Sequence, residues 1–512
     1  MSVSDVYDAV SNFIADSSTW IWYVAFVFLV GFGIFATIKS KGIQINRLGE
    51  ACKVAFTGIR EKKGKHIISS FQAFCVSMGA RIGVGNIAGV ATAIVMGGPG
   101  AVFWMWIFAI IGAATSFVEN TIGQIYKEKK GDGYFHGGPA YYIKNGLGKP
   151  RLAILMSLLI IVTYGLCFIG VQANQASNSL QTAFDGAFGG AVLTIGGSSF
   201  SVLSIVIGII LAILTAVIVF GGIRRVARVS TWLVPTMAVL WMVMAGILIL
   251  VNFTQVSAVV ETIFSYAFGA QAFVGGGIGT MIMWGLKRGV FSNEAGIGSI
   301  PNVSSSAHVK HPVKQGLMQS LGVLIDTIVV CTATAFVVIM YTNVAYPEYD
   351  FAAQGIASSL AGSPLVSEAL SATFLGVAAP YILAAFLLVF AFSSLISYYS
   401  MSESNVKFIT EKKGAIIALR IVIILMVFFS SIWSMTLAWN LADVFQALMG
   451  IFNVAIIIFL AKHAWTALTD YFNQKADGVE EPVFNPAILS SQKGITCWPP
   501  KEEDEEPNKG IQ

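Results

Sequence analysis

The chain has 512 residues, of which 56% are hydrophobic and only 11% are charged, and its mean hydropathy is +0.75. Soluble proteins carry about twice that share of charged residues, so the composition excludes a soluble globular protein and indicates one that crosses a membrane several times. The net charge of +4 gives no indication of a nucleic-acid partner, and the five cysteines predict no disulfide framework.

Eleven windows of about 20 apolar residues predict membrane-spanning helices. In chain order they cover residues 20–38, 69–95, 101–126, 152–181, 200–221, 231–253, 272–300, 315–341, 371–400, 414–437 and 441–466. The preceding residues 1–19 lack the positive region of a cleaved signal peptide. A transmembrane domain is therefore expected over residues 20–466. The charged, Pro-containing tail at 467–512 is expected to be disordered.

Lys and Arg residues occur almost only in alternate connections between these windows. Apart from Arg81, they lie in residues 39–68, 127–151, 222–230, 287–314, 407–420 and 462–512. The intervening connections and the N-terminus carry none. Because basic loops stay in the cytoplasm, the pattern predicts a multi-pass protein of the cell membrane with its N-terminus outside and its C-terminus in the cytoplasm.

The second window is too rich in glycine to be a plain spanning helix. Its Gly79–Gly89 stretch contains Arg81 and Asn86 among four glycines. Glycine weakens helix interiors, and a backbone that unwinds inside a membrane must be buried or line a polar cavity. Close helix packing through small residues is the alternative. The two polar side chains favour a binding site, because polar groups at this depth are usually functional.

Both ends of such a break offer binding groups. Backbone amides of Gly83, Gly85 and Asn86 would begin the second half-helix, whose positive end favours an anion such as a carboxylate. Carbonyl oxygens released between Gly79 and Ile82 could bind a hard cation.

The window at 272–300 is also irregular. It contains the glycine run Gly275–Gly279 and a second polar stretch, Trp284–Gly298. If the first window is an extra helix, the others form two sets of five, residues 69–253 and 272–466, and the second set must run inverted. Paired Gly-interrupted segments at corresponding positions point to a transporter site. The residues alone put the second break at Gly275–Gly279.

Two further groups of polar side chains lie within apolar windows. Ser393 and Ser394 are expected, in the simplest interpretation, to bond back to their own helix carbonyls. Gln172, Gln175 and, less well, Asn178 lie near one helix face. That row either faces a substrate or marks the polar end of the helix, and Gln172 is the deepest.

Several charged residues also fall in or beside the windows. Asp326 and Glu119 should face the bundle interior, and Asp326 could pair with Arg81 or assist a cation. Lys287 and Arg288 could line a cytoplasmic vestibule or hold the second break together. No HExxH spacing or nucleophile–base pair occurs, so the sequence does not support an enzyme.

Five stretches resemble the alanine or glycine:cation symporter family. They are Gly83–Ala91, Gly98–Ile107, Gly137–Pro139, Met283–Gly296 and Asp326–Cys331. The resemblance implies an all-α polytopic membrane protein with 11 transmembrane helices, in which one extra N-terminal helix precedes a 5+5 inverted repeat like that of the leucine transporter. It also implies alternating access that imports a small neutral amino acid with a sodium ion, and no other cofactor.

The resemblance further implies which residues bind. The substrate pocket falls on Gly83, Gly85, Asn86, Gln172, Phe291, Ser292 and Asn293. The sodium site falls on the backbone of Gly79 and Ile82 and on the hydroxyls of Ser393 and Ser394. The second break accordingly moves from Gly275–Gly279 to Phe291–Glu294.

The chain departs from the family pattern beside the expected pocket. Phe168–Gln172 stands where many members read Gly-Asn-Met-Val-Gln, and Ser397-Tyr398 stands where many have Gly-Trp. Tyr398 leaves more room than Trp and adds a hydroxyl. Alanine and glycine are the default substrates and glutamine stays open. The expected partners are the amino acid, sodium and the lipid bilayer, with no nucleic acid. The rival hypotheses are a proton-coupled amino-acid permease and a transporter-like nutrient sensor.

Overall fold

The computed structural model describes residues 3–59, 67–184, 190–195, 198–268, 277–345, 360–432 and 436–498. Within these ranges, nine helices are long and apolar enough to cross a membrane. They match nine of the predicted windows, and the remaining two windows, at 69–95 and 272–300, are interrupted. The chain is therefore a multi-pass membrane protein, and its described residues are helical apart from loops and two short hairpins.

Seven of the long helices are uninterrupted. They are α1 (Val3–Lys39), α6 (Ala101–Ile125), α10 (Val202–Val219), α11 (Gly222–Val251), α18 (Ala379–Ile409), α19 (Lys413–Ile432) and α20 (Thr436–Ala476). The other two contain a π-helical turn: α8 (Pro150–Val162), η2 (Thr163–Phe168) and α9 (Ile169–Phe184) form one, and α15 (Val313–Leu324), η5 (Ile325–Cys331) and α16 (Thr332–Ala345) form the other. Such turns are rare in proteins, and those that occur are often found at functional sites.

Two apolar segments are broken into half-helices. The first consists of α4 (Ser70–Arg81), the 3₁₀ turn η1 (Val84–Asn86) and α5 (Ala88–Gly97), and the second of α13 (Gly277–Asn293), an irregular stretch and α14 (Pro301–Ser304). The second break begins at Glu294, which has a positive φ of 54°, and continues through Gly296 and Gly298 at 81° and 79°. Left-handed backbone cannot continue a helix, so α13 ends there.

Shorter elements lie between or after the long helices. They are α2 (Ile43–Asn46), α3 (Leu48–Gly58), α7 (Pro139–Leu147), η3 (Phe253–Gln255), α12 (Val256–Phe268), α17 (Ser363–Ser371), η7 (Gly376–Ala378) and η8 (Pro486–Ile488). Strand β1 (Glu128–Lys129) pairs antiparallel with β2 (Phe135–His136), and β3 (Val192–Ile195) pairs antiparallel with β4 (Ser198–Ser201). The helices α12 and α17 lie where plain loops were expected, and each is too short to span a bilayer.

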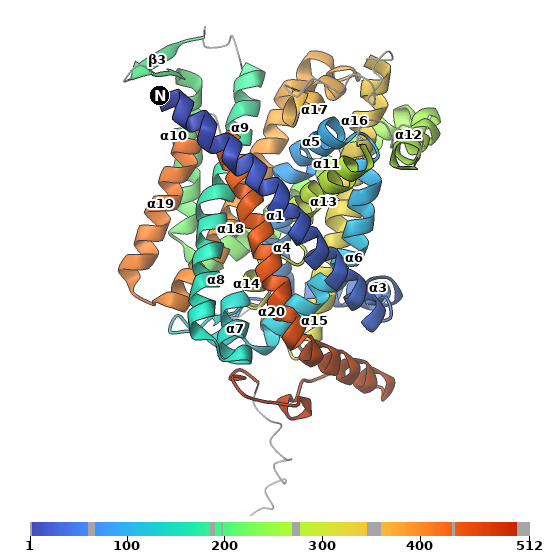
Figure 1. Cartoon of the computed structure of the whole chain (residues 1–512), viewed down its shortest axis with the longest axis vertical. Helices are drawn as coiled ribbons and strands as arrows, with labels where there is room; N and C mark the ends of the chain where they lie inside the picture. Colours follow the sequence, from blue (N-terminus) through green and yellow to red (C-terminus); the bar gives the residue numbers. More distant parts are fainter. Residues whose placement is uncertain are drawn as a thin grey trace, which may run out of the picture.

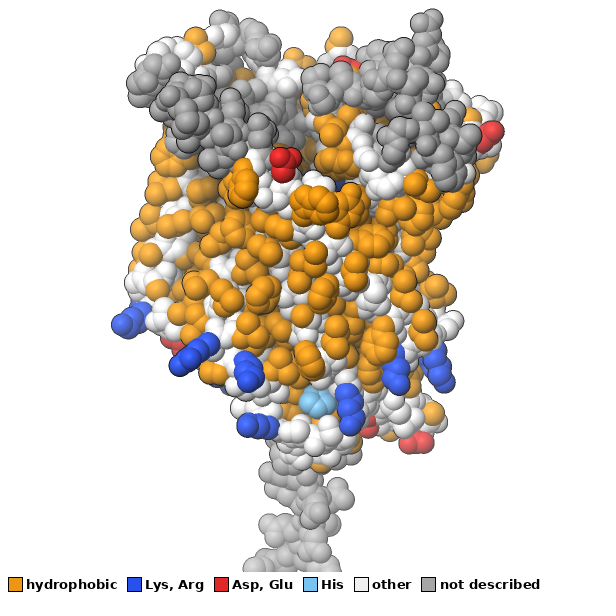
Figure 2. Space-filling view, in the orientation of Figure 1, with side chains coloured by type: hydrophobic (Ala, Val, Ile, Leu, Met, Phe, Trp, Pro, Cys, Tyr) orange, Lys and Arg blue, Asp and Glu red, His pale blue; other side chains and the backbone are white. Residues whose placement is uncertain are grey.

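The side chains are distributed as a bilayer requires. A broad hydrophobic band crosses the face shown in Figure 2, and Lys and Arg side chains gather below it at one end, here called the basic end. Helix α1 runs obliquely across the bundle beside α20 and packs on α6 (Figure 1). Helices α3 and α7 lie towards the basic end, whereas α12 and α17 lie towards the opposite end (Figure 1).

The residues after 466 are folded up to Trp498. Helix α20 continues to Ala476, so the predicted domain boundary falls inside it. The Trp498 indole donates to the carbonyl of Gln124 at 3.1 Å, and the Phe484 amide donates to the carbonyl of Lys310 at 3.0 Å. The expected disorder therefore does not describe residues 467–498, because buried aromatic side chains attach them to the bundle. Residues 499–512 lie outside the described ranges.

Candidate functional site

The first break is held by side-chain oxygens that accept from its own amides. The Gly83 amide donates to Asn86 Oδ1 at 2.9 Å, and the Val84 amide donates to Gln172 Oε1 at 3.2 Å. The Asn86 amide donates to the Gly83 carbonyl at 3.2 Å. Two amides expected to be free, those of Gly83 and Asn86, are thus engaged. The Val84 amide, which sequence reasoning did not single out, points at a side-chain acceptor of the kind a carboxylate could replace.

Asp326 joins the two breaks. Its Oδ1 accepts from Asn86 Nδ2 at 2.6 Å, and its Oδ2 accepts from the hydroxyls of Ser292 at 2.8 Å and Thr327 at 3.0 Å. All four side chains are fully buried. The π-helical turn η5 places Asp326 and Thr327 at this point, and Asp326 forms no ion pair with a described Lys or Arg.

Arg81 has a different role from the one expected. Its Nε donates to the Asn293 carbonyl at 2.7 Å, one Nη to Gln319 Oε1 at 3.0 Å and the other to Ser116 Oγ at 3.1 Å. The guanidinium therefore satisfies a carbonyl that the end of α13 leaves free. Asn293 Nδ2 donates to Thr327 Oγ1 at 3.1 Å, so both the carbonyl and the side-chain amide of the last residue of α13 are hydrogen-bonded.

Glu119 on α6 holds the unwound backbone beyond that point. Its carboxylate accepts from the amides of Gly296 at 3.2 Å and Gly298 at 3.1 Å, and from Asn453 Nδ2 at 2.7 Å. The irregular segment is therefore fixed by α6 and α20 rather than by its own sequence.

Five oxygen atoms converge between the first break and α18. Ser394 Oγ lies 2.9 Å from the Gly79 carbonyl and 3.2 Å from the Phe390 carbonyl. Ser393 Oγ lies 3.3 Å from the Ile82 carbonyl, 3.4 Å from that of Gly79 and 2.8 Å from that of Phe390. Neutral oxygens of this kind suit a hard monovalent cation.

This cluster reconciles two interpretations of the serine pair. The hydroxyls bond back to their own helix, as the simplest interpretation expected, and they also reach the carbonyls of the first break. Sequence reasoning missed the Phe390 carbonyl. The available signal was that Phe390 lies one helical turn before the serines.

Gln172 and Tyr398 connect the break amides with the last turn of α4. The Gln172 side chain, which accepts from Val84, donates from Nε2 to the Tyr398 hydroxyl at 3.3 Å, and that hydroxyl donates to the Ala80 carbonyl at 3.1 Å. Of the predicted polar row, Asn178 instead bonds Asn174 on its own helix at 3.0 Å. The row therefore does not act as one unit.

An aromatic layer and a buried ion pair cover the break on the side away from the basic end. Phe291 stacks on Phe168 with ring centres 4.9 Å apart and lies 5.1 Å from the ring of Trp439. Beside them, Arg288 Nη2 binds both carboxylate oxygens of Asp443 at 2.5 and 2.6 Å.

The position of Lys287 and Arg288 therefore corrects one expectation. Both residues lie within α13, and the Lys287 ammonium is 6.0 Å from the ring of Trp22 on α1. They do not line a vestibule at the basic end, because α13 approaches the break from the opposite end (Figure 1).

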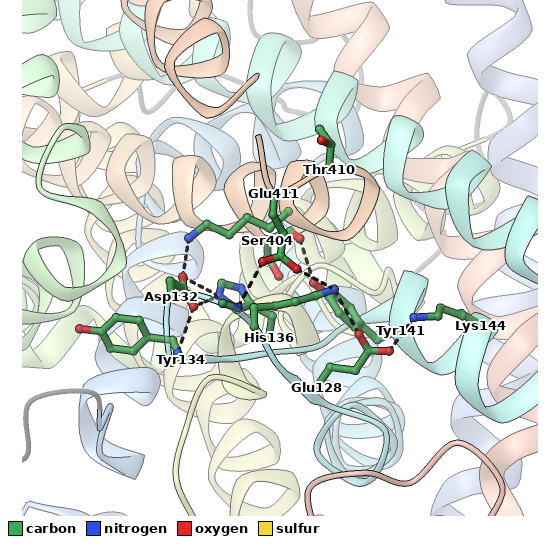
Figure 3. A network of polar contacts seen from close by, with 12 residues as sticks. Glu128, Asp132, Tyr134, His136, Tyr141, Lys144, Ser404, Thr410 and Glu411 are labelled. Atoms are coloured by element: carbon green, nitrogen blue, oxygen red, sulfur yellow. Dashed lines mark hydrogen bonds and ion pairs between the residues drawn. The ribbon is translucent and has the colours of Figure 1, made fainter. Parts of the chain in front are cut away.

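A polar network lies at the basic end (Figure 3). Asp132 pairs with His136 at 3.1 Å and with Lys407 of α18 at 2.7 Å, and the Tyr141 hydroxyl donates to the Ser404 carbonyl at 3.3 Å. Burial opposes ionisation of Asp132, but the hydrogen bonds and charges of His136 and Lys407 outweigh it and hold its pKa well below the usual range. The network attaches the β1–β2 hairpin and α7 to the end of α18.

Two broken helices that meet in the centre of a membrane-spanning bundle, with polar groups around both breaks, define a membrane transporter. The chain matches the sodium:alanine symporter family over residues 7–486 and belongs to that family, as the resemblance predicted. It is thus a sodium/alanine-type amino-acid symporter and not an enzyme.

Individual relatives support this assignment. The probable sodium/glutamine symporter GlnT of Bacillus subtilis is 42% identical over 92% of both chains. The sodium/alanine symporter AgcS of Methanococcus maripaludis is 36% identical over 85% of this chain and 91% of its own. A solved structure, MhsT in complex with L-phenylalanine, aligns with a TM-score of 0.53 over 80% of this chain and 99% of that one. At 15% identity that likeness shows the fold alone.

Proposed function

We propose that the protein imports small neutral amino acids, with alanine and glycine as defaults and glutamine as a further candidate, together with sodium by alternating access. The observation that carries this proposal is the cluster of five oxygens between Gly79, Ile82, Phe390, Ser393 and Ser394. It joins one broken helix to α18 next to the amides of the same break. An ion bound there would therefore influence the backbone that receives the substrate.

Sodium binds, in this proposal, to the three carbonyls and two serine hydroxyls. The hydroxyls turn their lone pairs to the ion and bridge α4 to α18. The bound charge then stabilises the arrangement of the first break in which its amides are presented.

The substrate carboxylate replaces Gln172 Oε1 at the Val84 amide and approaches the amides of Gly83 and Gly85. The Gln172 amide then donates from Nε2 to the carboxylate. The substrate ammonium lies near Ser292, where the charge of Asp326 favours it. The side chain extends between the rings of the aromatic layer.

Transport requires that the two closures open in alternation. The aromatic layer with the Arg288–Asp443 pair closes one side, and the Asp132–Lys407 network closes the basic end. An inward-moving sodium ion supplies about 2.3 kcal/mol per 100 mV of membrane potential. Because sodium and substrate favour the same state, each raises the affinity of the other.

We further propose that the chain crosses the membrane eleven times. Helix α1 is an additional helix, and two inverted repeats follow at residues 69–253 and 272–466. The broken segments α4–α5 and α13–α14 are the first element of each repeat. The Lys and Arg residues gathered at one end support an orientation with that end and the C-terminus in the cytoplasm and the N-terminus outside (Figure 2).

Uptake by purified protein in liposomes tests the proposal. Radiolabelled alanine, glycine and glutamine are supplied with an inward sodium gradient and then with choline in place of sodium. Sodium-dependent accumulation is expected. Uptake that persists in choline would contradict sodium coupling and favour a proton-coupled permease, whereas binding without uptake would favour a sensor.

A further inference from the structure

Gln446 on α20 is fully buried, and neither its amide oxygen nor its amide nitrogen has a hydrogen-bond partner. An amide offers one acceptor and two donors, and leaving them unpaired inside a protein is unfavourable. Among the described residues, every other buried side chain with an unpartnered polar atom has a single such atom. Among the side chains that the structure describes, Gln446 is therefore the least satisfied buried amide.

The face of α20 that carries Gln446 is turned towards the second break. Trp439, seven residues earlier, contacts the Phe291 ring at 5.1 Å, and Asn453, seven residues later, donates to the Gly296 carbonyl at 2.9 Å. Positions seven residues apart lie two turns apart on one helix face. Gln446 thus lies between these two contacts, level with the unwound backbone.

The proposed substrate pocket leads towards this amide. The Val84 amide, where the carboxylate is proposed to bind, is held by Gln172, and Phe168 lies one turn before Gln172 on the same helix. The Phe168 ring stacks on Phe291, and the π-helical turn that carries Phe168 packs against α20. A side chain that extends along these rings from the carboxylate position therefore approaches Gln446.

We infer that Gln446 hydrogen-bonds the terminal polar group of the transported amino acid, and that the protein takes neutral amino acids with a side-chain amide, glutamine above all. This inference rests on the proposed function. An amide is complementary to a second amide, because each supplies a donor and an acceptor. The rings of Phe168 and Phe291 suit the methylene groups between the two ends. Alanine and glycine are too short to reach Gln446.

Competition experiments on the full-length protein test this inference. Sodium-dependent uptake of labelled alanine into proteoliposomes is inhibited with unlabelled glutamine for wild type and for Gln446→Leu, which keeps the side-chain size but removes the amide. The loss of one or two uncharged hydrogen bonds predicts an inhibition constant for glutamine that is about tenfold higher. The half-saturation values for alanine and for sodium should stay within about twofold, since neither ligand reaches the amide.

Thr215→Val on α10 is the control, because it also removes a fully buried polar group without a partner. Its ratio of glutamine to alanine affinity should equal that of wild type. Gln446→Asn provides a second test if the leucine variant does not fold. It keeps the amide but withdraws it by one methylene, so it too should lower the ratio.

The outcomes separate this inference from the proposed function. If wild type shows no sodium-dependent uptake of labelled alanine, glycine or glutamine, the proposed function fails. If wild type transports alanine but glutamine does not compete, or if the ratio is unchanged in both Gln446 variants, the role of Gln446 is overturned while the symporter proposal stands.

Discussion

Replacing Ser394 by alanine should impair sodium binding more than amino-acid recognition. The change removes one of the five oxygens around the proposed ion, the one 2.9 Å from the Gly79 carbonyl. A hydrogen-bonding group that serves a charged partner contributes about 1.5–3 kcal/mol. The sodium concentration for half-maximal alanine uptake should therefore rise about 10- to 100-fold.

Ser397→Ala is the matched control on the same helix. The Ser397 hydroxyl donates to the Ser393 carbonyl at 2.8 Å, a bond within its own helix, so its loss should change the sodium requirement by less than about twofold. Both variants are measured in proteoliposomes with saturating alanine, because coupling otherwise transfers a change in sodium affinity to alanine.

Gln172→Ala supplies the reciprocal measurement. It removes the side chain at the Val84 amide, and the alanine half-saturation should rise about 2- to 15-fold at saturating sodium. The reasoning is refuted if Ser394→Ala and Ser397→Ala have equal sodium requirements, or if Ser394→Ala and Gln172→Ala shift both ligands alike.

Three further changes test other contacts. Gly83→Ala should abolish uptake in protein that still folds, since a Cβ atom would lie 2.3 Å from Ser394 Oγ. Normal uptake would contradict the close approach of the first break to α18. Asp443→Asn should lower the free energy of unfolding by about 3 kcal/mol, because Arg288 stays buried without its carboxylate, and the unfolding temperature in detergent should fall with it; an unchanged melting curve would contradict a tight pair. Asp132→Asn should be less stable than wild type above about pH 4, where the carboxylate of the wild type is charged in the unfolded state as well. Below that pH the difference in unfolding free energy should shrink, because the stabilisation that the lowered pKa provides is lost as Asp132 is protonated. A difference in unfolding free energy that does not change with pH would contradict the charged network.

Local chemistry explains why much of the fold could be predicted. A composition of 56% hydrophobic residues allows only a membrane protein, and spans of about 20 residues are set by bilayer thickness. The first break was also predictable, since Gly79, Gly83 and Gly85 weaken the helix at the point where the structure unwinds.

The second break was not predictable from local chemistry. The glycine run favoured by the residues begins at Gly275, which lies outside the described ranges, whereas its last residues, Gly277–Gly279, form the first turn of α13. Unwinding instead follows Asn293, where Glu119 and Asn453 from distant helices satisfy the freed backbone. The motif resemblance, at Phe291–Glu294, came nearer, but Phe291–Asn293 still belong to α13 and only Glu294 lies in the break.

The sequence by itself determined the membrane class, the number of apolar segments and the family, and it predicted most of the proposed ligands, because these depend on composition, local backbone preference and motif. Only the tertiary structure decided which groups meet. The approach of the Ser394 hydroxyl to the Gly79 carbonyl, the link from Asp326 to both breaks and the pairing of Arg288 with Asp443 join residues on different helices. Their proximity follows from helix packing, which no local pattern encodes.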